Sequence, residues 1–217
     1  MFGDERHLAR QITSNIKSDP YLSVKDVILG DRMSKMGFED VLSRYFDVYA
    51  PRYMARPDII IVAEDVKNVV DEWLMVAMEL KYFKVSEDAK KFEKDLREAF
   101  REIGQPLRYY LYGFDFAVLW HIFEGDADIE ILRSYSNLVS EVFNKLRLPV
   151  VCFSTRILDK DNLLVFQPLE TSSPSNTGYI VRRMLNYCRD GVRNPLLPQD
   201  KEIKERRRAL KTILNVP

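Results

Sequence analysis

The fold is decided by two apolar runs, Asp58-Ile59-Ile60-Ile61-Val62 and Trp73-Leu74-Met75-Val76-Ala77-Met78-Glu79-Leu80-Lys81. The stretch between them is polar enough for a solvated turn, so the two runs predict a β-hairpin. Side chains alternate between the two faces of a strand, so Glu79 and Lys81 share one face while Leu80 points to the other, into a core. Asp58 comes alongside Glu79 if the two strands pair antiparallel.

This set of two acids and one lysine is costly at the end of an apolar hairpin unless it has a function. Two carboxylates about 4 Å apart repel by about 4 kcal/mol at an effective dielectric constant near 20, which corresponds to about 3 pKa units. A divalent cation removes that repulsion, and Mg²⁺ prefers carboxylate oxygens, water and phosphate. The pattern therefore indicates metal-dependent cleavage of a phosphodiester, in which Lys81 orients or deprotonates the attacking water or stabilises charge on the phosphate. The alternative is a solvated hairpin end with an ordinary Glu79–Lys81 salt bridge.

Composition excludes few function classes. The chain has 217 residues, of which 46% are hydrophobic, and this length suits one domain with extensions or two small domains. Lys and Arg together number 33, as do Asp and Glu. The resulting neutral charge neither supports nor excludes binding to nucleic acid.

The two cysteines, Cys152 and Cys188, form no CxxC motif, and we interpret them as reduced thiols, with one disulfide as the open alternative. The first residues contain no apolar signal-peptide stretch, and no run approaches the roughly 18 apolar residues of a membrane span. We therefore expect a cytoplasmic protein without a membrane partner.

Hydrophobic periodicity and breaker residues predict the remaining elements. Helices are expected at 4–18, 23–29, 34–45, 87–103, 107–112, 129–146, 179–189 and 201–214. Further strands are expected at 52–55, 114–123, 149–154 and 163–166, with a Ser/Pro/Asn loop at 171–177. The order predicts an α/β fold with a mixed central β-sheet flanked by helices. We divide the chain into an N-terminal helical extension (1–32), a core (33–168) and a C-terminal loop with helices (169–217).

Pro57-Asp58, Glu79-Leu80-Lys81 and the helix–three strands–helix–strand order resemble the PD-(D/E)XK nuclease superfamily, over about residues 35–123. The resemblance implies a restriction-endonuclease-like core that binds Mg²⁺ or Mn²⁺ through Asp58, Glu79 and the carbonyl of Leu80. The family often carries another acid on the helix before the hairpin. Residues 37–42 look like that helix, which makes Glu39 a further metal or water contact.

The branch that resembles RecB and Cas4 nucleases has a Gln and a Tyr four residues apart after the lysine strand. Gln105 and Tyr109 match this spacing, which places both on one helix face. No cysteine cluster like that of the Cas4 iron–sulfur proteins is present, so that cofactor is not implied. Size and organisation are also similar to archaeal Holliday-junction resolvases and to small nucleases from viruses of thermophilic archaea.

These features predict a Mg²⁺-dependent deoxyribonuclease, an endonuclease rather than an exonuclease, acting on branched or recombination-intermediate DNA. Resolving a junction would need two sites and therefore a homodimer. Arg97, Arg101 and Arg108 follow the lysine strand and would line the DNA groove. The alternative is a catalytically inactive nuclease-fold protein that binds nucleic acid or another protein.

Each candidate also has an ordinary structural interpretation. Glu39 could be a surface acid, Gln105 a helix cap and Tyr109 a core residue. We interpret His121 as a packed or hydrogen-bonded strand residue, because one histidine does not make a zinc site. For the run 206–208, Arg-Arg-Arg, we favour a solvated helix face over a phosphate contact.

Overall fold

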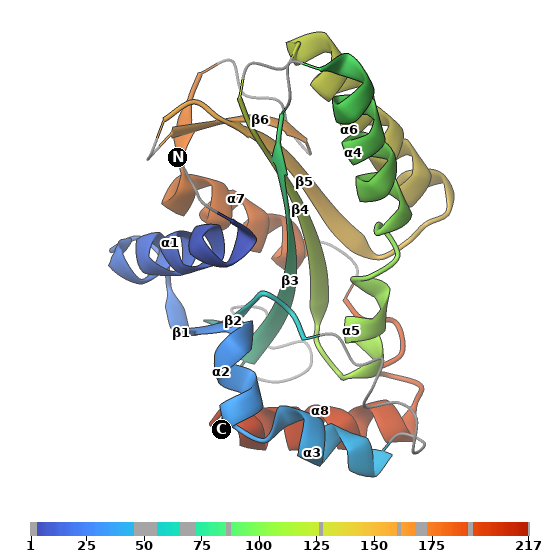
Figure 1. The fold of residues 1–217 in the computed structure, drawn as a ribbon. Helices are drawn as coiled ribbons and strands as arrows, with labels where there is room; N and C mark the ends of the chain where they lie inside the picture. Colours follow the sequence, from blue (N-terminus) through green and yellow to red (C-terminus); the bar gives the residue numbers. More distant parts are fainter. Residues whose placement is uncertain are drawn as a thin grey trace.

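The computed structural model describes residues 4–45, 56–65, 73–85, 88–125, 128–159, 162–167, 173–190 and 193–216. Its centre is a seven-stranded mixed sheet in which the spatial order of the strands follows their order in the chain (Figure 1). The strands are β1 (Val24–Leu29), β2 (Ile59–Glu64), β3 (Trp73–Lys84), β4 (Phe116–Glu124), β5 (Val150–Ile157), β6 (Asn162–Gln167) and β7 (Ser175–Asn176).

Helices connect and cover this sheet. They are α1 (Glu5–Ser18), α2 (Gly30–Lys35), α3 (Phe38–Leu42), α4 (Ala89–Arg101), α5 (Leu107–Leu111), α6 (Ile129–Lys145), α7 (Thr177–Asp190) and α8 (Lys201–Ile213), with a 3₁₀ turn at Ser43–Tyr45. The predicted mixed α/β class is confirmed. No described helix has the length and apolar character needed to cross a bilayer.

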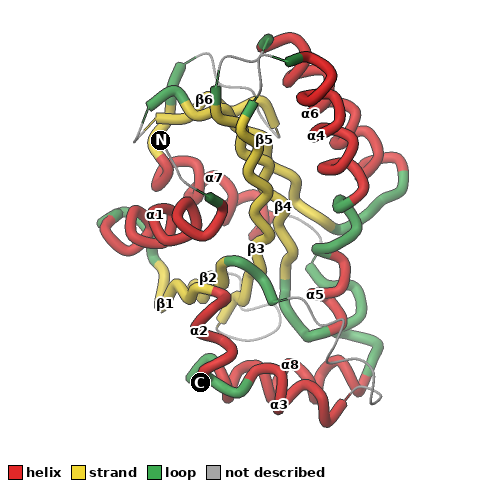
Figure 2. Tube along the Cα trace, viewed as in Figure 1, coloured by secondary structure: helices red, strands yellow, loops and turns green. Residues whose placement is uncertain are grey.

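Strand direction changes once from antiparallel to parallel and once back. β1, β2 and β3 pair antiparallel, β3–β4 and β4–β5 pair parallel, and β5, β6 and β7 pair antiparallel again. A parallel pair needs a long crossover, and α4 with α5 supplies it between β3 and β4, as α6 does between β4 and β5. Figure 2 shows these strands as one continuous yellow layer with helices on either side.

The sheet separates two hydrophobic cores. One lies beneath α4, α5 and α6, and the odd-numbered positions of β3, such as Met75 and Ala77, point into it. The other lies beneath α1 and α7, and Val76, Met78 and Leu80 point into it. The strand alternation predicted for residues 73–81 is therefore confirmed. Both cysteines are free and buried, Cys152 in the first core and Cys188 in the second.

The helix predicted at 23–29 is wrong, because these residues form β1 and pair with β2. The run is too short for periodicity to separate helix from strand, and pairing with β2, which is buried at every residue except Glu64, decides the outcome. The single helix predicted at 34–45 is also wrong. Gly37 has a φ of 75°, in the left-handed region, and it separates α2 from α3.

Other boundaries shift or fall outside the described residues. The predicted strand at 52–55 and most of the hairpin turn lie outside them. The expected loop at 171–177 contains the short strand β7. Residues 1–32 contribute β1 to the sheet, and α1 packs against α7.

The C-terminal helix is attached by buried charges. Arg207 Nη1 lies 2.9 Å from Asp115 Oδ2, and Arg193 pairs with Asp65, which is also buried. Arg206 and Arg207 are only 8% and 5% exposed, so the solvated face predicted for this run is wrong at those two positions. Gly113, with a φ of 92°, permits the contact, because a Cβ there would lie 2.7 Å from the Arg207 backbone.

Candidate active site

The candidate site lies where β3 continues beyond the end of β2. The last pair between the two strands is Ile59 with Met78, and β3 then runs on to Lys84 beside β4 alone. The backbone groups on the vacated side need other partners. Asp58 Oδ2 accepts a 2.7 Å hydrogen bond from the Leu80 N–H, and the Glu5 carboxylate accepts one from the Tyr82 N–H.

This opening collects groups from both sides of the sheet. Glu5 arrives from the first turn of α1, and Asp58 lies in line with the strands. The N–H and C=O of one strand residue point to the same edge, so the Leu80 carbonyl also faces the opening. The structure thus brings Asp58, Glu5 and the Leu80 backbone to one edge of β3.

Glu79 and Lys81 stand beside this edge, on the side of α5. Lys81 Nζ lies 3.0 Å from Glu79 Oε1 and 3.0 Å from Glu102 Oε2. The Tyr109 hydroxyl donates a hydrogen bond to the other oxygen of Glu79, which is 6% exposed. Glu79 is therefore held on both oxygens, and Lys81 between two carboxylates.

Little positive charge lies near the carboxylates of this edge to compensate them. Burial, and then the nearby charge of Glu79, raise the pKa of Asp58 to about 7. Burial also raises the pKa of Glu5, although Lys81 and the Tyr82 amide act in the opposite direction. Lys81 therefore compensates only part of the negative charge that these carboxylates carry when ionised.

Lys81 and Tyr109 are both held in their protonated forms. Burial disfavours the charged form of Lys81, but Glu79 and Glu102 together outweigh it and raise the pKa of the lysine. Burial and the charge of Glu79 likewise raise the pKa of Tyr109. Near neutral pH Lys81 is an ammonium ion, which suits orienting water or stabilising a phosphate rather than accepting a proton.

Glu39 and Gln105 do not join the cluster directly. Glu39 Oε1 lies 3.0 Å from Arg56 Nε, two residues before Asp58. Gln105 precedes α5 rather than lying on it, and its buried Oε1 accepts no hydrogen bond within the described residues. Only Tyr109 of the predicted Gln/Tyr pair is observed to contact Glu79.

The three arginines proposed to line a DNA groove have different surroundings. Arg97 is exposed on α4 and pairs with Glu93 at 2.6 Å. Arg101 is exposed in the last turn of the same helix. Arg108 is half-buried, and its Nε lies 3.3 Å from the Gln105 carbonyl oxygen.

Sequence reasoning missed Glu5 and Glu102. The sequence did hold a signal for Glu5, because it lies three and four residues before Leu8 and Ala9, which belong to the buried stripe of α1. An acid on that stripe was a candidate for a buried role. Glu102 follows the last turn of α4 among many charged residues, and nothing in the sequence distinguishes it.

The donor groups at this edge suit a divalent cation. No three His, Cys, Asp or Glu side chains within the described ranges lie together as a ready-made metal-binding group. Mg²⁺, however, commonly takes one or two carboxylates, with water and substrate phosphate completing its shell. Asp58, Glu79 and the Leu80 carbonyl provide such oxygens, and the raised pKa of Asp58 marks negative charge that a cation would neutralise.

Comparison with known proteins adds no assignment. No protein-family model, curated protein or solved structure matches this chain. Any functional conclusion therefore depends on the residues themselves and their geometry.

Proposed function

We propose that this protein is a Mg²⁺- or Mn²⁺-dependent nuclease that hydrolyses DNA phosphodiester bonds, with a PD-(D/E)XK-type site built on Asp58, Glu79 and Lys81. The observation that carries the proposal is the meeting of Asp58 and Glu5 at the open edge of β3, directly beside Glu79 and Lys81. Glu79 is buried, Asp58 and Glu5 are half-buried, and acids with a raised pKa that share one lysine at an open strand edge mark a functional-site candidate.

The order of elements supports the same proposal. Apart from the short helices α2, α3 and α5 and the 3₁₀ turn, the elements run α1, β1, β2, β3, α4 and β4, with β4 parallel to β3, which is compatible with a helix–three strands–helix–strand core. In this alignment α1 takes the place that the sequence suggested for residues 34–45. The helix acid of the site is then Glu5, and Glu39 serves to hold Arg56.

The roles follow from the contacts. A cation held by Asp58, Glu79 and the Leu80 carbonyl would supply Lewis-acid charge and an acidified water. The Lys81 ammonium orients the attacking water or stabilises the negative charge on phosphorus-bound oxygens. Tyr109 and Glu102 are positioning residues, since they hold Glu79 and Lys81. Hydrolysis forms a bond from water oxygen to phosphorus and breaks one P–O ester bond, and the leaving oxygen takes up a proton.

The decisive experiment is a cleavage assay with plasmid, single-stranded and four-way-junction DNA in Mg²⁺ or Mn²⁺. We expect the wild-type protein to cut at least one substrate, and Asp58→Asn, Glu79→Gln and Lys81→Met each to cut at least about 100-fold more slowly. Glu141→Gln, on the exposed face of α6, is the matched control. A folded wild type that cuts nothing, or variants that cut like the control, would refute the proposal.

A non-catalytic nucleic-acid-binding protein with this fold is the second candidate. The specific observation in its favour is that Lys81 pairs with two carboxylates, an arrangement that also occurs in structural ion pairs. DNA binding without cleavage, together with no heat of Mn²⁺ binding in calorimetry, would favour this candidate. A homodimer, needed for cutting both strands of a junction, is tested by sedimentation.

A further inference from the structure

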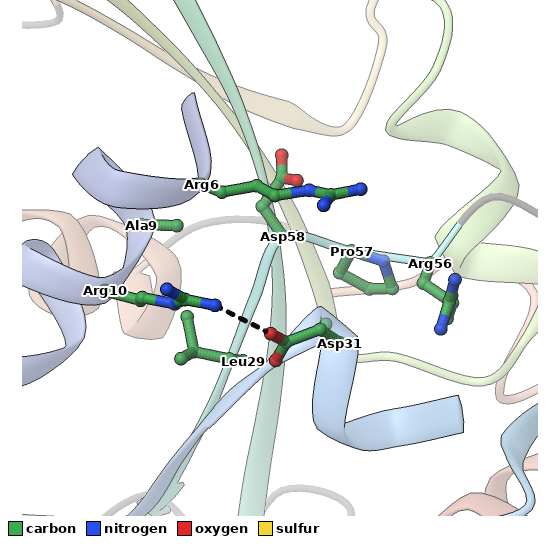
Figure 3. Close-up of a pocket in the computed structure, with 9 residues that line it drawn as sticks. Arg6, Ala9, Arg10, Leu29, Asp31, Arg56, Pro57 and Asp58 are labelled. Carbon is green, nitrogen blue, oxygen red and sulfur yellow. Dashed lines mark ion pairs between the residues drawn. The ribbon is translucent and has the colours of Figure 1, made fainter. Parts of the chain in front are cut away.

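A pocket of about 370 Å³ adjoins the acid cluster on the side of α1 (Figure 3). Its walls are the face of α1 that carries Arg6 and Arg10, the junction of β1 with α2, and the segment that leads into β2. Asp58 belongs to both the pocket and the acid cluster. A ligand in the pocket would therefore lie next to the site where the phosphodiester is cut.

Three arginines line this pocket and make it a candidate anion-binding site. Arg6 and Arg10 are four residues apart on α1, so they share one helix face, and Arg56 lies across the pocket from them. Two carboxylates, Asp31 and Asp58, also line the pocket, and the Arg56 guanidinium pairs with Glu39 at 3.0 Å. Guanidinium groups bind phosphate oxygens through paired, charge-assisted hydrogen bonds.

The existing ion pairs would not prevent such binding. Arg10 lies 3.6 Å from Asp31, and both side chains are more than half exposed. Exposed pairs of this kind contribute little, because water screens them and ordering both side chains costs entropy. Arg6 has no carboxylate partner within the described part of the chain, and it lines the same pocket as Asp58 (Figure 3).

The wall opposite α1 is held in place by backbone contacts. The Gly30 N–H donates a 2.9 Å hydrogen bond to the Asp58 carbonyl oxygen. A Cβ on Gly30 would lie 2.1 Å from the Pro57 carbonyl oxygen, so only glycine permits this approach. The end of β1 and the start of β2 are thus locked together, which fixes Asp58 relative to the arginines.

We propose that this pocket binds a phosphate group of the nucleic-acid strand, adjacent to the phosphodiester at Asp58 and Glu79. The inference rests on the proposed function, since it places the substrate strand relative to that site. The phosphate could be an internal phosphodiester of a continuous strand or a phosphomonoester at a strand end. The two sources share the same recognition by arginine.

The test measures binding without cleavage, by fluorescence anisotropy of labelled single strands in EDTA. The strands carry a 5′-phosphate, a 3′-phosphate or hydroxyl groups at both ends. We expect the double variant Arg6→Gln/Arg10→Gln to bind at least about tenfold more weakly, and the slope of log K against log salt to become shallower by about 0.7, the value for one neutralised phosphate of a single strand. The matched control is Lys94→Gln/Lys145→Gln, which removes two exposed positive charges, each from an ion pair on another helix.

The strand ends separate the two sources. An equal loss for all three strands identifies an internal phosphate, and a loss confined to one phosphorylated strand identifies a terminal phosphomonoester. A double variant that remains folded by circular dichroism and binds like the control overturns the inference, as does a wild type that binds none of the strands.

Failure of the inference is distinguishable from failure of the nuclease proposal. A protein that cuts nothing but loses affinity in the double variant keeps the phosphate pocket and loses the nuclease assignment. A protein that cuts DNA while Arg6 and Arg10 are irrelevant to binding keeps the nuclease assignment and loses the pocket.

Discussion

The Asp58 carboxylate accepts a 2.7 Å hydrogen bond from the backbone N–H of Leu80, two residues beyond the last pair between β2 and β3. A side chain thus replaces the strand that would otherwise pair there. The same edge receives Glu5 from α1 one step further along β3. The candidate site therefore exists because β3 extends beyond the end of β2, its antiparallel neighbour.

Glu5 and Glu39 give opposite expectations. Glu5→Gln should slow DNA cleavage about 10- to 100-fold, because it removes a carboxylate that lies beside Lys81 at the open edge of β3. Glu39→Gln should change the rate less than about threefold, since Glu39 contacts only the partly exposed Arg56 among the described residues. Initial cleavage rates of the two variants are compared. Equal losses of cleavage rate, or a larger loss in Glu39→Gln, would show that Glu39 rather than Glu5 is the helix carboxylate that serves the site.

Tyr109→Phe removes the hydroxyl that donates to Glu79 and leaves the ring in the core. We expect cleavage to fall about tenfold and half-saturation to need more Mn²⁺, because the glutamate is no longer held in one orientation. The free energy of unfolding should change by about 1–2 kcal/mol. A Mn²⁺ titration of the cleavage rate is the measurement. The role of Tyr109 as a positioning residue is lost if the metal dependence stays that of the wild type.

Asp58→Asn should stabilise the metal-free protein at alkaline pH. The pKa of Asp58 is about 7 in the folded protein against 3.8 ordinarily, so the folded state holds a proton that the unfolded state has lost. This term favours folding at low pH and is lost as the pH rises from about 4 to 7. Glu79 and Glu5 oppose ionisation there and Lys81 favours it.

The measurement is urea unfolding of both proteins in EDTA at pH 5 and pH 8. We expect the free energy of unfolding of Asp58→Asn, relative to that of the wild type, to rise by about 1–3 kcal/mol from pH 5 to pH 8. Mn²⁺ at pH 8 should stabilise the wild type and not the variant. Parallel pH dependence in both proteins would show that Asp58 ionises freely.

His121 should destabilise the fold in acid. It is fully buried between Phe83 and Tyr135, with neither ring nitrogen hydrogen-bonded among the described residues. Burial, and then the charge of Lys81, lower the pKa of His121 to about 3. Stability is therefore lost as the pH falls from about 6.5 towards 3, where only the unfolded state is protonated.

His121→Phe should remove this pH dependence. Its free energy of unfolding, relative to that of the wild type, should rise by about 2 kcal/mol as the pH falls from 6.5 to 4.5. Thermal or urea unfolding at the two values measures it. An unchanged slope in the variant would mean that the histidine is protonated in the folded protein.

Arg207→Met should destabilise the protein without changing a residue of the candidate site. It leaves Asp115, which has no exposed surface, without its closest cation, and a broken buried pair costs about 3–5 kcal/mol. Arg208→Met, on the exposed side of the same helix, should change stability by less than about 0.5 kcal/mol. Urea unfolding compares the two. Similar stabilities would contradict the anchoring role of Arg207.

The sequence by itself determined the hairpin, the face on which Glu79 and Lys81 lie together, and the amphipathic helices α1, α4 and α6. These depend on local periods, two residues for a strand and 3.6 for a helix, which neighbours along the chain settle. The face that β3 buries could be predicted for the same reason.

Only the tertiary structure decided which distant groups meet. It made residues 24–29 a strand because β2 pairs with them, and it brought Glu5 rather than Glu39 to the edge of β3. It also buried Arg207 against Asp115. Partners of this kind are chosen by packing and by the need to satisfy buried polar groups across the whole chain, and no local pattern encodes them.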